Sequence, residues 1–260
     1  MVRALIFDCD GVLADTERYG HLPAFNQTFA EFHLTAHWSE EDYGEKLKIS
    51  GGKERMASLL TDSFVRENHL PTDQEGQRQA LAEWHKRKTA IYTDLVAAGR
   101  LPGRPGVARV VNAAVQADWK LAVASTSAEA SVRAVLEHVV GVENAAHFAV
   151  LAGDIVARKK PAPDIYLAAL QRLAVAPDDA LVIEDSRNGL LAAVNAGLNC
   201  VVTRSSYTQD EDMREAILVV SSLGDPDAPM RVEANRGPAK PGSYITLDDL
   251  AACLPAGGDE

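Results

Sequence analysis

Two aspartates follow the first apolar run of the chain, in the segment Phe7-Asp8-Cys9-Asp10-Gly11. In a parallel sheet, ligands bind beyond the carboxyl ends of the strands, so both acids lie where an active site is expected. Alternate residues of an extended backbone point the same way, which aims Asp8 and Asp10 together. Neighbouring carboxylates repel each other, and a bound cation removes that repulsion. Two solvated turn aspartates would produce the same short pattern.

Two later strand ends offer partners for a phosphate group. Ser125-Thr126-Ser127 places hydroxyl donors at the end of an apolar run, although Thr126 or Ser127 could instead cap the following helix. Lys160 stands directly before Pro161, in a rigid turn that leads into a helical pattern. A proline fixes the backbone of such a turn, which favours a positioned lysine over an ordinary surface charge.

A fourth apolar run ends in Glu184-Asp185. Carboxylate oxygens are the ligands that hard cations prefer. Polar residues at one strand end are ordinary. Four such ends that meet at one edge of a sheet favour an active site.

The elements that position these residues follow from hydrophobic periodicity. From about residue 104, short β-branched runs alternate with helical patterns, which predicts an α/β fold with a parallel sheet. We expect strands at residues 4–7, 120–124, 148–151, 180–183 and 200–203, helices between them, a loop at 222–243 and a last helix at 247–254.

Between Thr16 and Gly99 the pattern changes to helices without strands. One helix should begin near His21 or Leu22, because Pro23 is tolerated only in a first turn. A longer helix is expected over residues 77–96. The prediction is therefore a core domain of residues 1–15 and 100–260 with a helical domain of residues 16–99 inserted into it.

Composition limits the classes of partner. Of 260 residues, 26 are Lys or Arg and 37 are Asp or Glu, a net charge of −11, so we expect neither nucleic acid nor membrane as partner. Three widely spaced cysteines indicate a reducing compartment. We expect a monomeric cytoplasmic enzyme, or a stromal one in plastids if a transit peptide has been removed.

The combination of these motifs resembles the haloacid dehalogenase (HAD) superfamily, whose four motifs occur in the same order on successive strand ends. In this chain they are Asp8-x-Asp10, Ser125, Lys160 and Glu184-Asp185. The resemblance covers essentially the whole chain. It implies a Rossmann-like HAD core and a small inserted α-helical cap that closes over the substrate. The acid at Asp10 is typical of members that transfer phosphate, because dehalogenases lack it.

Within that superfamily the chain is similar to the CbbY-like group, through residues 7–17, 20–21, 24–29, 43–49 and 51–56. The most diagnostic segment is Gly51-Gly52-Lys53-Glu54-Arg55. It is not a Walker P-loop, because Leu47 stands where that motif requires its first glycine. Glycine backbone and two cations suit a second phosphate, while a helix-opening loop with solvated charges is the plainer alternative.

The resemblance also implies roles for the core residues. Asp8 would be the nucleophile, Asp10 the general acid and base, and Ser125, Thr126 and Lys160 would surround the phosphate. Mg²⁺ would be held by Asp8, the Asp10 carbonyl and Asp185, with Glu184 as a ligand or directly behind one.

In the insert, the resemblance implies that substrate is bound by Glu17, His21, Gly51, Gly52, Lys53 and Arg55. His21 also fits a capping or packing role at the start of a helix. Leu22 and Ser50 depart from the pattern of the group, since a basic residue and a third glycine are expected there. These departures leave a different sugar phosphate open.

The implied function is a Mg²⁺-dependent phosphatase with an aspartyl-phosphate intermediate. Plant and photosynthetic members of the group act on xylulose 1,5-bisphosphate, a misfire inhibitor of Rubisco, and release xylulose 5-phosphate and phosphate, which would place the enzyme beside the Calvin cycle. A mutase similar to β-phosphoglucomutase and a phosphatase for another sugar phosphate are the alternatives. An inactive binding module is disfavoured, because it could have lost any of these side chains.

Overall fold

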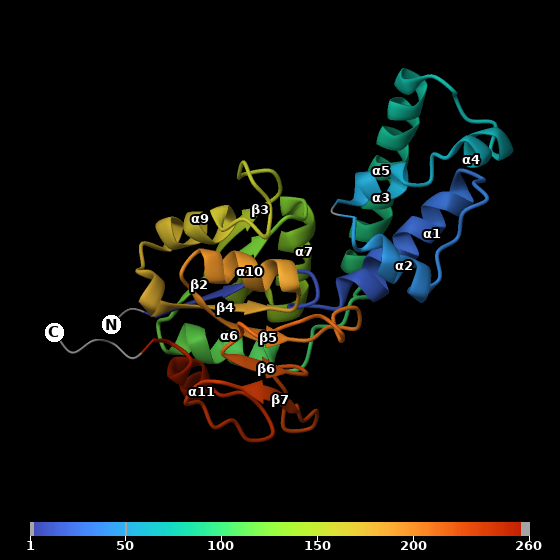
Figure 1. The fold of residues 1–260 in the computed structure, drawn as a ribbon. Coiled ribbons are helices and arrows are strands. Elements are labelled where there is room, and N and C mark those ends of the chain that lie inside the picture. The colour runs from blue at the N-terminus through green and yellow to red at the C-terminus, as the bar shows by residue number, and fades with distance from the viewer. Residues whose placement is uncertain (1–2, 50, 256–260) are drawn as a thin grey trace. The chain divides into compact units, whose positions relative to one another are not determined.

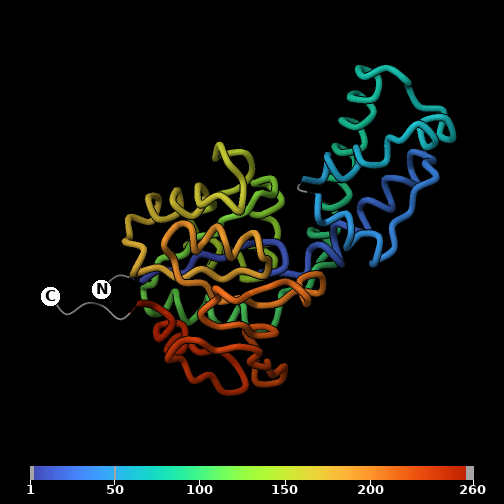
Figure 2. Tube along the Cα trace, in the orientation of Figure 1, coloured from blue at the N-terminus to red at the C-terminus, as the bar shows by residue number. Residues whose placement is uncertain are grey.

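The computed structural model describes residues 3–49 and 51–255. The chain divides into two compact units: a core unit, Met1–Asp15 with Leu101–Glu260, and an inserted unit, Thr16–Arg100. Figure 2 traces the chain through both units. The predicted division put its second boundary one residue earlier. The departure noted at Ser50 lies outside the described residues.

The core unit contains a seven-stranded sheet in the order β3-β2-β1-β4-β5-β6-β7. All neighbouring strands are parallel except β6 and β7. This arrangement confirms the predicted α/β class with a Rossmann-like core. The strands are β1 (Ala4–Phe7), β2 (Lys120–Ser125), β3 (Phe148–Ala152), β4 (Ala180–Glu184), β5 (Asn199–Thr203), β6 (Leu218–Val220) and β7 (Val232–Asn235).

Helices cover both faces of this sheet (Figure 1). A parallel sheet that is buried on both sides needs nearly continuous apolar strands, and all four residues of the central strand β1 are buried. On one face lie α9 (Asp164–Leu173) and α10 (Arg187–Asn195), and on the other lie α6 (Val107–Gln116) and α7 (Glu129–Val140), with α11 (Leu247–Ala252) against α6. Short helices α8 (Val142–Ala145) and η2 (Pro177–Asp179) complete the unit.

The prediction that residues 222–243 form a loop is wrong in one part. Strand β7 lies within it and pairs antiparallel with β6, Leu218 opposite Asn235. Its sequence, Val-Glu-Ala-Asn, is mostly exposed at the edge of the sheet, so it carries no apolar alternation that would reveal a strand.

The described residues of the inserted unit form helices joined by turns and loops, with no strand among them. It consists of η1, a π-helix (Glu17–His21), followed by α1 (Leu22–Glu31), α2 (Glu40–Lys46), α3 (Gly52–Ala57), α4 (Asp62–Glu67) and α5 (Gln74–Ala97). Helix α1 begins at Leu22 with Pro23 in its first turn, as predicted, whereas the preceding π-helix was not predicted. The aromatic rings of Phe25 and Phe29 pack on Trp38, with centroids 5.0 and 4.8 Å away.

Cys9, Cys200 and Cys253 are buried and free. Across residues 3–49 and 51–255, no helix is both long enough and apolar enough to cross a membrane. The compartment and the monomeric state stay predictions.

Candidate active site

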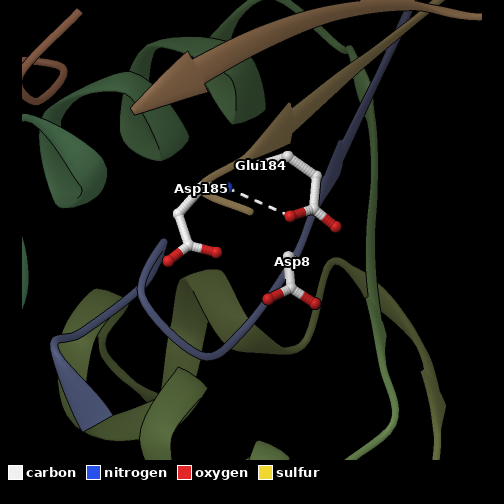
Figure 3. A group of neighbouring side chains, drawn as sticks. All are labelled: Asp8, Glu184 and Asp185. Carbon is white, nitrogen blue, oxygen red and sulfur yellow. Dashed lines mark hydrogen bonds between the residues drawn. The ribbon is translucent and has the colours of Figure 1, made fainter. Parts of the chain in front are cut away.

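Three carboxylates meet at the carboxyl edge of the sheet (Figure 3). Asp8 directly follows β1, Glu184 is the last residue of β4, and Asp185 directly follows β4. One oxygen from each carboxylate lies within 4.8 Å of the others. The register of the sheet causes this meeting, because Phe7 on β1 lies opposite Ile183 on β4. All three side chains are buried, Glu184 completely.

The electrostatics of this cluster favour a cation. Burial raises the pKa of Asp8 to about 7, with Glu184 and Asp10 acting in the same direction and Lys160 against them. Burial and the charges of Glu184 and Asp8 also raise the pKa of Asp185 well above its usual value. Facing buried carboxylates are costly unless positive charge compensates them. Oxygen ligands at this spacing therefore fit a hard divalent ion such as Mg²⁺.

Lys160 supplies positive charge from the chain itself. Its Nζ lies 2.6 Å from Asp8 Oδ1 and 2.7 Å from Glu184 Oε1, and it also donates to the Ala124 carbonyl at 3.0 Å. Burial opposes the charge on this lysine, but Asp8 and Glu184 outweigh that effect and raise its pKa. With its side chain only 10% exposed, Lys160 is not an ordinary surface charge.

Glu184 is held by protein donors at both oxygens. Besides Lys160, Oε1 accepts a hydrogen bond from the Tyr166 hydroxyl at 2.6 Å. Oε2 accepts from the Asp185 backbone N–H at 3.0 Å, drawn in Figure 3, and from the Ser186 hydroxyl at 3.2 Å. Because both oxygens of Glu184 already accept hydrogen bonds from protein groups, Glu184 is better suited to orient Lys160 than to bind a metal ion directly.

Two glycines make room for these carboxylates. A Cβ atom on Gly11, whose φ is +80°, would lie 2.0 Å from Asp185 Oδ2. A Cβ atom on Gly189 would lie 1.8 Å from Glu184 Oε1. The backbone of the Asp8 loop and of α10 therefore passes directly against the acidic cluster.

We expect Gly189→Ala to lower kcat for p-nitrophenyl phosphate at least tenfold. The added methyl group must displace Glu184 and with it Lys160, and overpacking of this kind costs roughly 1–3 kcal/mol of stability. Steady-state kinetics and thermal melting measure the two effects. Asn188→Ala, an exposed change in the same helix, is the control. Full activity in Gly189→Ala would show that the placement of Glu184 does not matter.

Asp10 lies outside the acidic cluster and contacts hydroxyl groups instead. Its Oδ2 accepts hydrogen bonds from Ser127 at 2.5 Å and from Ser125 at 3.5 Å. Helix α7 begins at Glu129 without a side-chain cap, so the alternative that Thr126 or Ser127 caps it is wrong. Thr126 itself is exposed. Ser127 was expected as a hydroxyl donor at this strand end, but its hydrogen bond to Asp10 was not predicted.

Arg104 is a second residue that the sequence interpretation missed. Its guanidinium donates to the backbone carbonyls of Gly11, Thr203 at 2.9 Å, Arg204 at 2.6 Å and Ser221 at 2.7 Å. It thereby ties the Asp8 loop to the ends of β5 and β6. The Gly/Pro-rich sequence around Arg104 indicated a domain boundary but did not indicate a role for this arginine.

In the inserted unit, two of the expected substrate residues pair with each other. The guanidinium of Arg55 lies 3.4 Å from the carboxylate of Glu17. Tyr43 hydrogen-bonds to both of them. The sequence segment that contains Tyr43 supported the family resemblance, but no role was predicted for this residue.

His21 is buried and belongs to a different cluster. Its Nδ1 lies 2.8 Å from Lys88 Nζ, and its ring stacks on Tyr92 with centroids 4.1 Å apart. It makes no side-chain capping bond to α1, so the capping alternative is wrong and the packing one describes its environment. Lys88 could have been noticed, because it is a charged residue on the apolar stripe of the long helix α5.

The glycine motif opens helix α3. Gly51 precedes it with a φ of +96°, and Gly52 is its first residue. Lys53 is exposed in the first turn. The position of a Cβ atom on Gly52 lies 3.5 Å from Nε2 of His85. His85, on α5, is a further polar neighbour of this motif that was not predicted.

Comparison with known proteins agrees with this geometry. The sequence model of the haloacid dehalogenase-like hydrolases matches residues 2–197. The "CBBY-like protein" of Arabidopsis thaliana is 45% identical over 223 residues, 86% of this chain and 70% of that protein. "Protein CbbY, plasmid" of Cupriavidus necator is 41% identical over 256 residues, 96% of this chain and 95% of that one.

A solved structure is also similar. CbbY from Rhodobacter sphaeroides, crystallised as a variant in complex with xylulose-(1,5)bisphosphate, superposes with a TM-score of 0.75 at 38% identity, covering 87% of this chain and 98% of that one. Fold, motifs and sequence identity agree over nearly the whole length. The chain therefore belongs to the haloacid dehalogenase-like hydrolases, as a phosphatase of the CbbY-like group.

Proposed function

We propose that this protein is a Mg²⁺-dependent sugar-phosphate phosphatase that acts through an aspartyl-phosphate and hydrolyses xylulose 1,5-bisphosphate to xylulose 5-phosphate and phosphate. The observation that carries the chemistry is the position of Lys160, which joins Asp8 to Glu184 beside the buried carboxylate of Asp185. The xylulose bisphosphate bound to the similar CbbY structure supports the choice of substrate.

In the first step, a carboxylate oxygen of Asp8 attacks phosphorus and the bond from phosphorus to the sugar oxygen breaks. Asp10 donates a proton to that leaving oxygen. The covalent route divides a very slow hydrolysis into two easier steps. The Ser127 hydroxyl, which donates to Asp10 Oδ2 at 2.5 Å, holds this carboxyl group in place.

In the second step, Asp10 takes a proton from water, whose oxygen attacks phosphorus. The acyl phosphate bond breaks, which returns Asp8 as a carboxylate and releases phosphate. One residue can serve as acid and then as base, because the leaving group has taken its proton.

Charge stabilisation comes from the surroundings of Asp8. The Lys160 ammonium and the Ser125 hydroxyl face the phosphoryl oxygens, where positioning and charge supply most of the catalysis. Mg²⁺ held by Asp8, Asp185 and the Asp10 carbonyl would supply positive charge that offsets repulsion between carboxylate and phosphate. Glu184 keeps Lys160 in position from behind.

The inserted unit acts as the cap in this proposal. Its Lys53 is the exposed cation for a distal phosphate, and Glu17 accepts from sugar hydroxyls. His21 and Arg55 support this recognition from buried or half-buried positions. Closing of a cap over substrate couples recognition to the exclusion of water.

The test is phosphate release with Mg²⁺ from xylulose 1,5-bisphosphate, ribulose 1,5-bisphosphate, fructose 1,6-bisphosphate and glucose 1-phosphate. We expect kcat/KM to favour xylulose 1,5-bisphosphate about a hundredfold, or about 2.7 kcal/mol of transition-state binding. Equal, slow rates would contradict the substrate while leaving the chemistry intact. Isomerised glucose phosphate without free phosphate, in the presence of a bisphosphate primer, would identify a mutase instead.

A further inference from the structure

A buried tyrosine joins two side chains that were expected to bind substrate separately. Tyr43, on α2, is fully buried. Its hydroxyl donates to Glu17 Oε2 and accepts from the Arg55 guanidinium at 2.9 Å. One hydroxyl group therefore uses both its donor and an acceptor site on residues from two other helices, η1 and α3.

Arg55 is committed to this network. Its Nε donates to the Ile49 carbonyl at 3.0 Å, and its Nη1 lies 3.4 Å from Glu17 Oε1. The guanidinium also lies 5.6 Å from the centroid of the Tyr43 ring. Only 13% of the Arg55 side chain is exposed, so its charge is largely matched within the inserted unit. Lys53, by contrast, is exposed.

Tyr43 is itself rigidly held. Its ring packs against Phe25 and Trp38, with centroids 5.7 and 5.9 Å away. Its helix is fixed at the N-terminus by a capping box between Ser39 and Asp42. A side chain packed in this way has little freedom, so the hydrogen bonds that it makes fix their partners in turn.

We propose that Tyr43 is a positioning residue for substrate recognition. With Arg55, it holds Glu17 so that this partly exposed carboxylate accepts hydrogen bonds from the sugar hydroxyls. Arg55 acts through Glu17 and not on the distal phosphate, which Lys53 binds. This inference rests on the proposed function and assigns its sugar contacts and its distal phosphate contact to different side chains.

The first test is Tyr43→Phe, which removes only the hydroxyl group. We expect kcat/KM for xylulose 1,5-bisphosphate to fall about tenfold to a hundredfold, mainly through KM, because a charge-assisted hydrogen bond to Glu17 is lost. For p-nitrophenyl phosphate, which has no sugar hydroxyls, kcat/KM should stay within about twofold. Tyr19→Phe, the same change at a tyrosine that is 46% exposed, is the control.

The second test separates Arg55 from Lys53. We expect Arg55→Gln to lower kcat/KM by the same factor for xylulose 1,5-bisphosphate and for xylulose 1-phosphate, which lacks the distal phosphate. Lys53→Gln should affect only the bisphosphate. This pair of variants also decides the question if Tyr43→Phe does not fold, since both changes are at residues outside the aromatic core.

Several results would overturn the proposal. A parallel loss on p-nitrophenyl phosphate in Tyr43→Phe would mean a merely structural tyrosine, and no loss on either substrate would mean no role. An Arg55→Gln effect confined to the bisphosphate would place Arg55 on the distal phosphate. Failure of the proposed function is distinct, because wild-type enzyme would then show no preference for xylulose 1,5-bisphosphate, and the Tyr43 proposal would fall with it.

Discussion

Asp8→Asn should abolish phosphate release from every substrate, with a loss on the order of 10⁴-fold to 10⁶-fold, as when other covalent enzymes lose their nucleophile. An amide does not form the aspartyl-phosphate, yet it matches the carboxylate in shape. It also removes one of three facing buried carboxylates and leaves Lys160 its contact with Glu184, so the fold should tolerate it. Phosphate release with a sensitive colorimetric assay, together with the midpoint of thermal unfolding, measures both effects.

The matched control is Asp154→Asn. This aspartate pairs with Lys159 on the surface and is 87% exposed, so the same chemical change there should leave activity unaltered. Residual activity of Asp8→Asn above a few per cent of wild type would contradict the covalent route. A large fall in its melting temperature would instead show that the ion pair between Asp8 and Lys160 is needed for folding.

Removal of divalent metal should be the second large effect. We expect a chelator to lower kcat at least a thousandfold and Mg²⁺ to restore it, because the buried acidic cluster lacks sufficient positive charge without an ion. Binding only to the folded state stabilises it by about 2.7 kcal/mol at a hundredfold excess over Kd. For a chain of this size, that corresponds to a rise in melting temperature of roughly 5–10 °C.

The pH dependence of this stabilisation has a definite sign. Burial raises the pKa of Asp8 from 3.8 to about 7, so the folded state binds the proton more tightly than the unfolded state. The metal-free protein therefore loses this contribution to its stability as the pH rises from about 4 to about 7. Since Mg²⁺ requires the ionised carboxylates, its effect on melting should be larger at pH 7.5 than at pH 5.

Differential scanning fluorimetry at the two pH values, with and without Mg²⁺, measures this difference. In Asp185→Asn the Mg²⁺ shift should be largely lost at both values, because one ligand is missing. An equal shift at pH 5 and pH 7.5 in the wild-type protein would argue that the ion binds elsewhere.

The short buried strand β6 (Leu218–Val220) was missed, but five of the seven strands of the core unit were predicted from the sequence. Its strands are apolar, short and regularly separated by helical patterns, because a parallel sheet buried on both faces requires such runs. Strand β7 could not be predicted, since an exposed edge strand obeys no such requirement. The π-helix Glu17–His21 could not be predicted either, because no residue pattern distinguishes it from the start of an ordinary α-helix.

The local chemistry of the candidate site was also visible in the sequence, because each motif directly follows an apolar run. Asp8, Ser125 and Asp185 lie at strand ends, and this position follows from the local sequence alone, independent of how the rest of the chain folds. Lys160 was identified by its rigid turn, but its two carboxylate partners lie 152 and 24 residues away.

Only the tertiary structure decided how these groups are paired. Sheet register brings Asp8 beside Glu184, helix packing puts the Tyr166 hydroxyl on Glu184, and Tyr43 reaches Glu17 and Arg55 across three helices. Periodicity reports which side of an element is buried but not which residue of another element meets it. Contacts between distant segments depend on the packing of whole elements, and a single sequence carries no local signal for that packing.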